Sequence, residues 1–132
     1  MNSVFDNILV QASLVPATRT ANANGTAVDT KGYSDGMLVV SAGDIDLASA
    51  DETYVFTVEE SDNGSTGWTA VSGISVAITA DNQVKEARLA DLNLARKRYL
   101  RAVLTVGGTT PSIPGEASIV LGRGASGAVG NA

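Results

Sequence analysis

Short apolar runs separated by turn residues make up most of the chain between residues 25 and 121. In residues 53–60, Tyr54, Phe56 and Val58 occupy every second position, which is the period of a strand with one buried face. Residues 74–79 alternate in the same way. The pattern predicts about eight strands, at residues 26–28, 37–42, 53–60, 68–71, 74–79, 84–89, 98–106 and 117–121.

Residues 83–104 are compatible with two kinds of element. They are rich in Ala, Leu, Arg, Lys and Glu, and taken alone they fit a helix of about twenty residues. Leu100, Ala102 and Leu104, however, recur at period two and lead to a Gly107-Gly108 turn. We therefore predict strands at 84–89 and 98–106, joined by a loop or a single helical turn.

The sequence divides into three parts by composition. Residues 1–24 are predicted to be an N-terminal arm, although Phe5, Ile8, Leu9 and Ala12 have the spacing of a short amphipathic helix. Residues 25–121 are predicted to be an all-β domain, and residues 122–132 a flexible Gly/Ala/Ser-rich tail. Eight strands at a spacing of about ten residues favour an antiparallel β-sandwich, jelly-roll-like, with an immunoglobulin-like sandwich as the alternative.

Composition narrows the possible chemistry. The 132 residues include no cysteine and no histidine. Ser-His-Asp and Cys-His pairs are therefore excluded, as are thiolate and imidazole ligands for a metal or haem. We expect a protein that is not an enzyme and binds no cofactor. Alanine is the commonest residue and aromatic residues make up only 5%, so the core is built from small side chains and association with a partner would add stability.

The termini and the overall charge bear on location and partners. No apolar run approaches 18 residues, and the first 14 residues contain no Lys or Arg that could begin a signal peptide. We expect a soluble protein that is made in a cytoplasm and has no membrane partner. A net charge of −5 argues against a nucleic-acid partner.

The charge is distributed unevenly along the chain. Between Asp29 and Asp62 there are nine acidic residues and one basic residue, a local charge of −8. Between Lys85 and Arg101 there are six basic and two acidic residues, a local charge of +4. These segments either contact a neighbouring copy or a partner, or form solvated faces that pair within one molecule. The candidate contact residues are Lys85, Arg88, Arg96, Lys97, Arg98, Arg101, Asp44, Asp46, Asp51, Glu52 and Trp68.

Three motifs and the sole tryptophan are weaker indications of a site. The acidic positions in residues 43–52 and 62–65 do not match an EF-hand loop, and no metal site is predicted. A glycosidase carboxylate pair lacks the aromatic residues expected around it. Residues 122–127 spell GxGxxG too close to the C-terminus to open a dinucleotide-binding helix. Trp68, the sole tryptophan, is predicted to fill the core, with a ligand-stacking platform as the alternative.

Two segments carry a resemblance to a known family. They are Glu59-Glu60-Ser61-Asp62-Asn63-Gly64 followed by Trp68, and Lys97-Arg98-Tyr99-Leu100-Arg101 followed by Gly107-Gly108. Over residues 16–121 the chain resembles small virion proteins of tailed bacteriophages, the capsid cement or decoration proteins. The resemblance implies a jelly-roll-like homotrimer on the outer capsid surface that clamps neighbouring major capsid subunits. It brings no catalytic residues.

Two function hypotheses follow. The first is a non-enzymatic cement protein of the virion, made in the bacterial host cytoplasm, whose partners are its own copies and the major capsid protein. The second is a receptor- or glycan-binding head or tail module, in which Trp68 and the loops at residues 43–52 and 61–68 would contact the ligand. A polysaccharide-degrading enzyme is a third class, which requires acidic side chains facing one another across a cleft.

Overall fold

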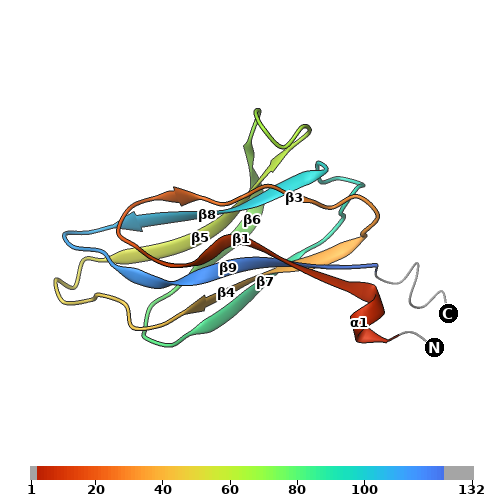
Figure 1. Cartoon of the computed structure of the whole chain (residues 1–132). Helices are drawn as coiled ribbons and strands as arrows, with labels where there is room; N and C mark the ends of the chain where they lie inside the picture. Colours follow the sequence, from red (N-terminus) through yellow and green to blue (C-terminus); the bar gives the residue numbers. More distant parts are fainter. Residues whose placement is uncertain (1–2, 124–132) are drawn as a thin grey trace.

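The computed structural model describes residues 3–123, which form two antiparallel sheets packed face to face (Figure 1). A single turn of helix, α1 (Val4–Asn7), precedes nine strands. These are β1 (Ile8–Arg19), β2 (Ala23–Asn24), β3 (Val28–Asp29), β4 (Asp35–Ala42), β5 (Thr53–Ser61), β6 (Thr69–Ala77), β7 (Val84–Leu89), β8 (Tyr99–Gly107) and β9 (Ile113–Gly122). No helix among the described residues is long enough to cross a membrane.

The strands pair as one long hairpin that is folded back on itself. The first strand β1 pairs with the last strand β9, β2 and β3 pair with β8, β4 pairs with β7, and β5 pairs with β6. Two further pairings, β4 with β9 and β5 with β8, roll this hairpin into sheets of order β1-β9-β4-β7 and β2-β8-β5-β6. This is the jelly-roll arrangement that was predicted. An immunoglobulin-like sandwich is excluded because its first strand pairs with the second.

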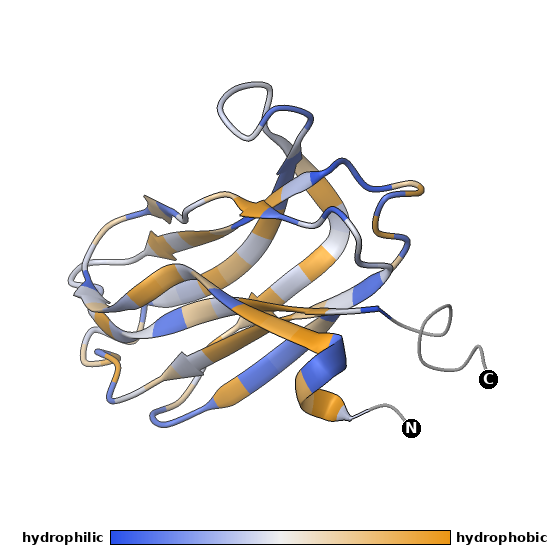
Figure 2. Cartoon of the chain, turned by 45° about the vertical axis from the view of Figure 1, so that its right-hand side comes forward, coloured by the Kyte–Doolittle hydropathy of each residue, from blue (hydrophilic) through white to orange (hydrophobic). Residues whose placement is uncertain are grey.

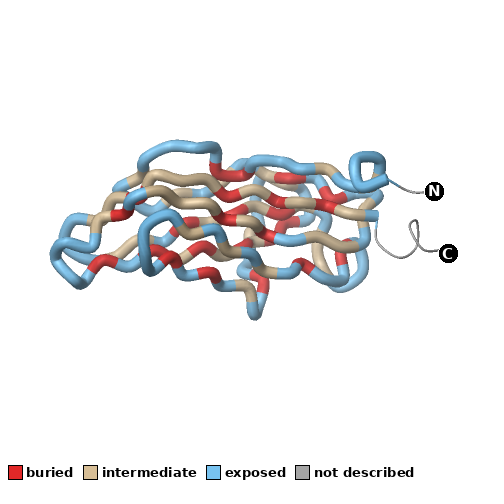
Figure 3. The backbone as a smooth tube through the Cα atoms, turned by 90° about the horizontal axis from the view of Figure 1, so that it is seen from below, coloured by how far each residue is buried: buried red, intermediate tan, exposed pale blue. Residues whose placement is uncertain are grey.

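The core lies between the two sheets, and buried residues alternate with more exposed ones along most strands (Figure 3). The alternation predicted for residues 53–60 and 98–106 is confirmed. The apolar inward side chains of β4, β5, β8 and β9 that are at most 2% exposed are Leu38, Val40, Tyr54, Phe56, Val58, Leu100, Ala102, Leu104, Ile113, Ala117, Ile119 and Leu121. One small alanine on each of β8 and β9 allows the sheets to approach closely.

The two interpretations of residues 83–104 are now resolved in favour of strands. β7 covers Val84–Leu89 as predicted, and β8 begins at Tyr99. Between them, Asp91 O accepts hydrogen bonds from the backbone N–H groups of Leu94, Ala95 and Arg96, which closes a single turn. The helical propensity of these residues is overridden because β7 and β8 each pair with a strand from the first half of the chain.

The N-terminal arm predicted for residues 1–24 is wrong over residues 8–19, which form β1. Of the helix that the spacing of Phe5 and Ile8 allowed, only the single turn α1 forms. Ser3 Oγ caps this turn by accepting a hydrogen bond from the N–H of Asp6 at 3.1 Å. The register of β1 against β9 shifts twice, between Ala12 and Leu14 and between Leu14 and Ala17. These irregularities break the two-residue period, which concealed the strand. Of the predicted tail, Gly122 belongs to β9, and residues 124–132 lie outside the described residues.

Tyr54 ties two loops to the edge of the core. Its ring is 1% exposed, its hydroxyl donates to Asp46 O at 2.6 Å, and the same hydroxyl accepts from the N–H of Ser112 at 2.8 Å. Nearby, Gly108 turns the chain after β8 with φ +99°, and a Cβ at this position would lie 2.6 Å from Asp51 O. Tyr54 and Gly108 therefore hold the loop of residues 43–52 against residues 108–112.

Replacing Tyr54 with phenylalanine removes only this hydroxyl. Asp46 O and the Ser112 N–H then lose their partner, and we expect the free energy of unfolding to fall by about 1–3 kcal/mol. Chemical denaturation of wild type and Tyr54→Phe measures the change. Tyr33→Phe is the matched control, since the Tyr33 hydroxyl makes no hydrogen bond among the described residues. Equal stability of Tyr54→Phe and wild type would contradict this role.

Candidate functional site

The outer face of the five-stranded sheet is organised by a charged pair between β5 and β8. The strand register places Glu59 directly opposite Arg101. Arg101 Nη2 and Nε donate to Glu59 Oε1 at 2.6 and 2.9 Å. The Trp68 ring, just before β6, lies over the Arg101 guanidinium at 4.3 Å from its centroid. Three strands thus contribute to one stack of carboxylate, guanidinium and indole.

This stack corrects the prediction for Trp68. The indole is partly exposed and lies outside the buried core cluster. The Arg101 side chain is 18% exposed. It reaches Trp68 because Glu59, its partner on β5, pairs with Ala70 on β6, which is two residues after Trp68 in the sequence. A lone tryptophan fills the core in many small domains, but here a cation from a distant strand provides its contact surface.

A second charged pair lies beside the start of β8. Arg98 Nε and Nη2 donate to Asp29 Oδ1 and Oδ2, both at 2.8 Å, and the guanidinium lies 5.1 Å from the centroid of the Tyr99 ring. Asp29 stands opposite Tyr99 in the pairing of β3 with β8. Hydrogen bonding from Arg98 lowers the pKa of Asp29 to about 2, and the N–H of Lys31 adds to this effect. The same hydrogen bonding raises the pKa of Arg98.

Three more ion pairs join basic residues of the segment 85–101 to acidic residues of the segment 29–62. Arg88 Nε lies 3.2 Å from Asp35 Oδ1, Arg96 Nε lies 3.6 Å from Glu60 Oε1, and Lys97 Nζ lies 3.9 Å from Asp62 Oδ2. The sixth base, Lys85, donates to the carbonyl of Ala77 at 2.9 Å. The alternative in which the two segments pair within one molecule is therefore the one the structure bears out. Intermolecular contacts through these residues would have to break or share existing pairs.

The remaining acidic candidates hold turns together. Asp44 accepts from the amide of Asn82, Asp46 accepts from the N–H of Ala48, and Asp51 accepts from the N–H and hydroxyl of Thr109. Glu52 is 7% exposed, and its Oε2 accepts from the Ser49 N–H and the Thr110 hydroxyl. In residues 3–123, no three His, Cys, Asp or Glu side chains gather where they could hold a metal ion. These four acids lie apart from the Arg101 stack.

The outer face of the four-stranded sheet has a different character. One row across it consists of Val10 on β1, Val120 on β9 and Met37 on β4, which stand opposite one another in register, and it ends at Arg88 on β7. Val10 is 62% exposed and Met37 is 37% exposed. Hydrophobic residues also cover the start of β1 beside α1 (Figure 2), where Phe5 is 89% exposed. Exposed apolar side chains gathered on one face are typical of surfaces through which proteins contact other molecules.

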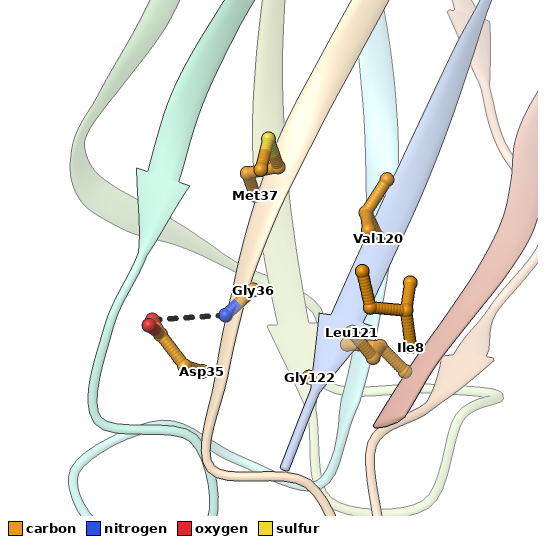
Figure 4. Close-up of a pocket in the computed structure, with 7 residues that line it drawn as sticks. All are labelled: Ile8, Asp35, Gly36, Met37, Val120, Leu121 and Gly122. Carbon is orange, nitrogen blue, oxygen red and sulfur yellow. Dashed lines mark hydrogen bonds between the residues drawn. The ribbon is translucent and has the colours of Figure 1, made fainter. Parts of the chain in front are cut away.

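A shallow hollow of about 150 Å³ opens in this face (Figure 4). It exists because Gly122 has no side chain while its neighbours do. Ile8 stands opposite Gly122 on β1, Asp35 stands opposite it on β4, and Val120 and Met37 occupy the adjoining row. Apart from the Asp35 carboxylate at the rim, the side chains around the hollow are apolar.

The strand sequences themselves carry a signal for this surface. Strand β5 alternates, but β1, β4 and β9 carry runs of consecutive apolar residues at 8–10, 37–40 and 119–121. Because successive residues of a strand face opposite sides, such a run places apolar side chains on both faces of its sheet. These three strands are neighbours, so their outward residues form one surface.

The chain matches no protein-family model, and a search of curated proteins finds no match either.

The Arg98–Asp29 pair leads to a prediction about pH. The pKa of Asp29 is lowered in the folded protein from 3.8 to about 2, so its stabilising contribution is present above about pH 4 and is lost as the pH falls towards 2. We expect the wild-type midpoint of thermal unfolding to drop over this window. Asp29→Asn, which cannot ionise, should be less stable at pH 6 and show a smaller drop.

Thermal unfolding followed by circular dichroism between pH 2 and pH 6 measures both curves. Asp46→Asn serves as the control because the Asp46 carboxylate accepts a backbone hydrogen bond in a turn and has no cationic partner among the described residues. Parallel curves for wild type and Asp29→Asn would refute the assignment.

Proposed function

We propose that the chain is a non-enzymatic structural protein of a phage virion. It binds the outer surface of the capsid and stabilises contacts between major capsid subunits. The observation that carries the proposal is the apolar outer face of β1, β9 and β4, with Val10, Val120 and Met37 in one row. The jelly-roll sandwich and the resemblance of residues 16–121 to decoration proteins support it further. In this proposal the protein is made in the host cytoplasm and acts on the virion.

The two outer faces of the sandwich have separate roles in this function. The face of β1, β9 and β4 loses apolar area to water on docking, which supplies the main driving force for binding. The face of β5 and β8 carries charge pairs that are already neutralised within the chain, as Glu59 and Arg101 illustrate, and it stays hydrated. This difference between the two faces orients each copy on a shell, and the function needs no catalytic group.

A charge placed on the β4 side of the apolar face, at Met37, tests the proposal. Met37→Lys should weaken binding to empty shells of the parent phage about tenfold or more, because an ammonium would be desolvated at the interface. Co-sedimentation of the purified protein with shells measures the binding. Leu94→Lys introduces the same charge at an apolar residue that is 85% exposed in the turn between β7 and β8, and it should bind as wild type does.

The outcomes separate clearly. A wild-type protein that never co-sediments with shells would reject the proposed function. Binding by Met37→Lys at wild-type affinity would reject the apolar face as the contact surface. Circular dichroism of both variants checks that the sandwich is retained, which we expect since Met37 points out of the core.

The partial exposure of Trp68 favours one second candidate, a receptor- or glycan-binding module. Its indole follows the loop of residues 62–67 and stands where a sugar ring could stack. Trp68→Ala should leave the fold intact because the ring lies outside the core. If the protein only binds capsid, shell binding and attachment to host cells stay unchanged in this variant.

Attachment to host cells is measured with fluorescently labelled protein. A loss of attachment in Trp68→Ala that Trp68→Phe restores would favour the receptor-binding function over the capsid function.

A further inference from the structure

The open edge of β1 is distinct among the sheet edges of the described chain. β1 is the outermost strand of its sheet and pairs only with β9. From Asn7 to Thr18 it has no charged residue. Its first five residues, Ile8 to Ala12, pair with β9 in unbroken register, whereas both irregularities lie further along the strand. An edge that is uncharged and regular is one that another strand can extend.

The other edges are protected. β7 carries Lys85, Glu86 and Arg88. β6 contains Gly73 at φ +84°, and its pairing with β5 is interrupted. β2 and β3 are two residues long each. Charges, irregularities and short length are the usual devices that prevent strands from associating at an edge.

A hydrogen bond just before β1 shows which of its backbone groups point towards β9 and which point away from it. The N–H of Arg123 donates to Asn7 O at 3.2 Å, so Asn7 faces β9 with its backbone groups. Successive residues of an antiparallel strand direct their N–H and C=O groups to alternate sides. Leu9 therefore also faces β9, while the C=O of Ile8 and the N–H and C=O groups of Val10 and Ala12 point to the open edge. The N–H of Ile8 closes the last turn of α1.

The open stretch has a defined end. The N–H of Thr26 donates to Ser13 O at 2.7 Å, and Ser13 Oγ donates to Thr26 O at 2.8 Å. Beyond Ala12 the edge is thus covered by the segment that leads into β3. Within residues 3–123 five backbone groups remain without a partner, the C=O of Ile8 and the N–H and C=O groups of Val10 and Ala12, and the Val10 side chain in the middle of them is 62% exposed.

We propose that two copies of the chain associate through this edge, with Ile8–Ala12 of each β1 paired antiparallel about a twofold axis at Val10. In this register Val10 stands opposite Val10 of the second copy, and Ile8 stands opposite Ala12. Four hydrogen bonds then join the two copies, two between the Val10 residues and one from each Ala12 N–H to the Ile8 carbonyl of the other copy, and the two four-stranded sheets become one sheet of eight strands.

The occupant is a second copy because the edge is complementary to itself. A twofold axis places each residue near its own equivalent, so any charge in the segment would face a like charge, and the segment has none. The Val10 pair is a β-branched contact of the kind that stabilises adjacent strands. The row of Val10, Val120 and Met37 also becomes continuous across the two copies, which doubles the width of the apolar face. The association does not depend on the capsid function.

A cysteine at the axis tests the proposal directly, since the natural chain has none. Opposed residues of a hydrogen-bonded antiparallel pair have Cα atoms about 5.5 Å apart, within the range that a disulfide spans. Under mild oxidation at low protein concentration, Val10→Cys should be converted largely to a species of twice 13.4 kDa on a non-reducing gel. Val84→Cys, at a 67% exposed position on the opposite edge of the same sheet, should stay at 13.4 kDa.

Light scattering of the purified chain, with no shell present, gives the second readout. Wild type should have the mass of two copies, and Val10→Lys should dissociate at a concentration about tenfold higher or more, because it places two like charges together. Val84→Lys should keep the wild-type mass. A monomer at all concentrations, a mass of three copies, which is the state that the resemblance to decoration proteins implies, or equal cross-linking of the two cysteine variants would overturn the proposal. A negative result here leaves shell binding to be judged by its own assay.

Discussion

Antiparallel pairing of the chain with itself, first strand against last and inward to β5 against β6, brings together the residues on which the remaining features depend. It sets β5, from the acidic half, beside β8, from the basic half, so that Glu59 and Arg101 are opposed. It also sets β9 between β1 and β4, which joins three apolar runs into one face. Finally, it leaves β1 at an edge where, among the described residues, the C=O of Ile8 and the backbone groups of Val10 and Ala12 have no partner.

The outer faces of the two sheets carry different kinds of side chains. On the five-stranded sheet, ion pairs that are partly shielded from water fix the register between distant segments, and Trp68 packs on one of them. Pairs of this kind add little net stability, but a wrong register would leave Glu59 or Arg101 without its partner. On the four-stranded sheet, Val10, Val120 and Met37 remain in contact with water. This contact is unfavourable in an isolated chain, and association with another molecule would remove it.

The sequence allowed β5, β8 and the sandwich class to be predicted because β5 and β8 alternate cleanly and β8 ends at the strong turn residues Gly107 and Gly108. It did not reveal β1, whose bulges near Leu14 break the period. The environment of Trp68 was also missed, since it depends on Arg101, a residue 33 positions away that only the strand register brings close. The apolar face was missed because a run such as 37–40 indicates only that apolar side chains lie on both faces of the strand. The run does not show what lies against the outer face.

The central claim is that the face formed by β1, β9 and β4 is the one that docks on another protein. The most direct measurement is a cryo-electron microscopy map of the parent particle at a resolution that separates the two sheets. The account predicts that Val120 and Met37 lie against capsid density while the Glu59–Arg101 pair and Trp68 point to solvent. A bound copy in the reverse orientation, with the four-stranded sheet exposed, would contradict it.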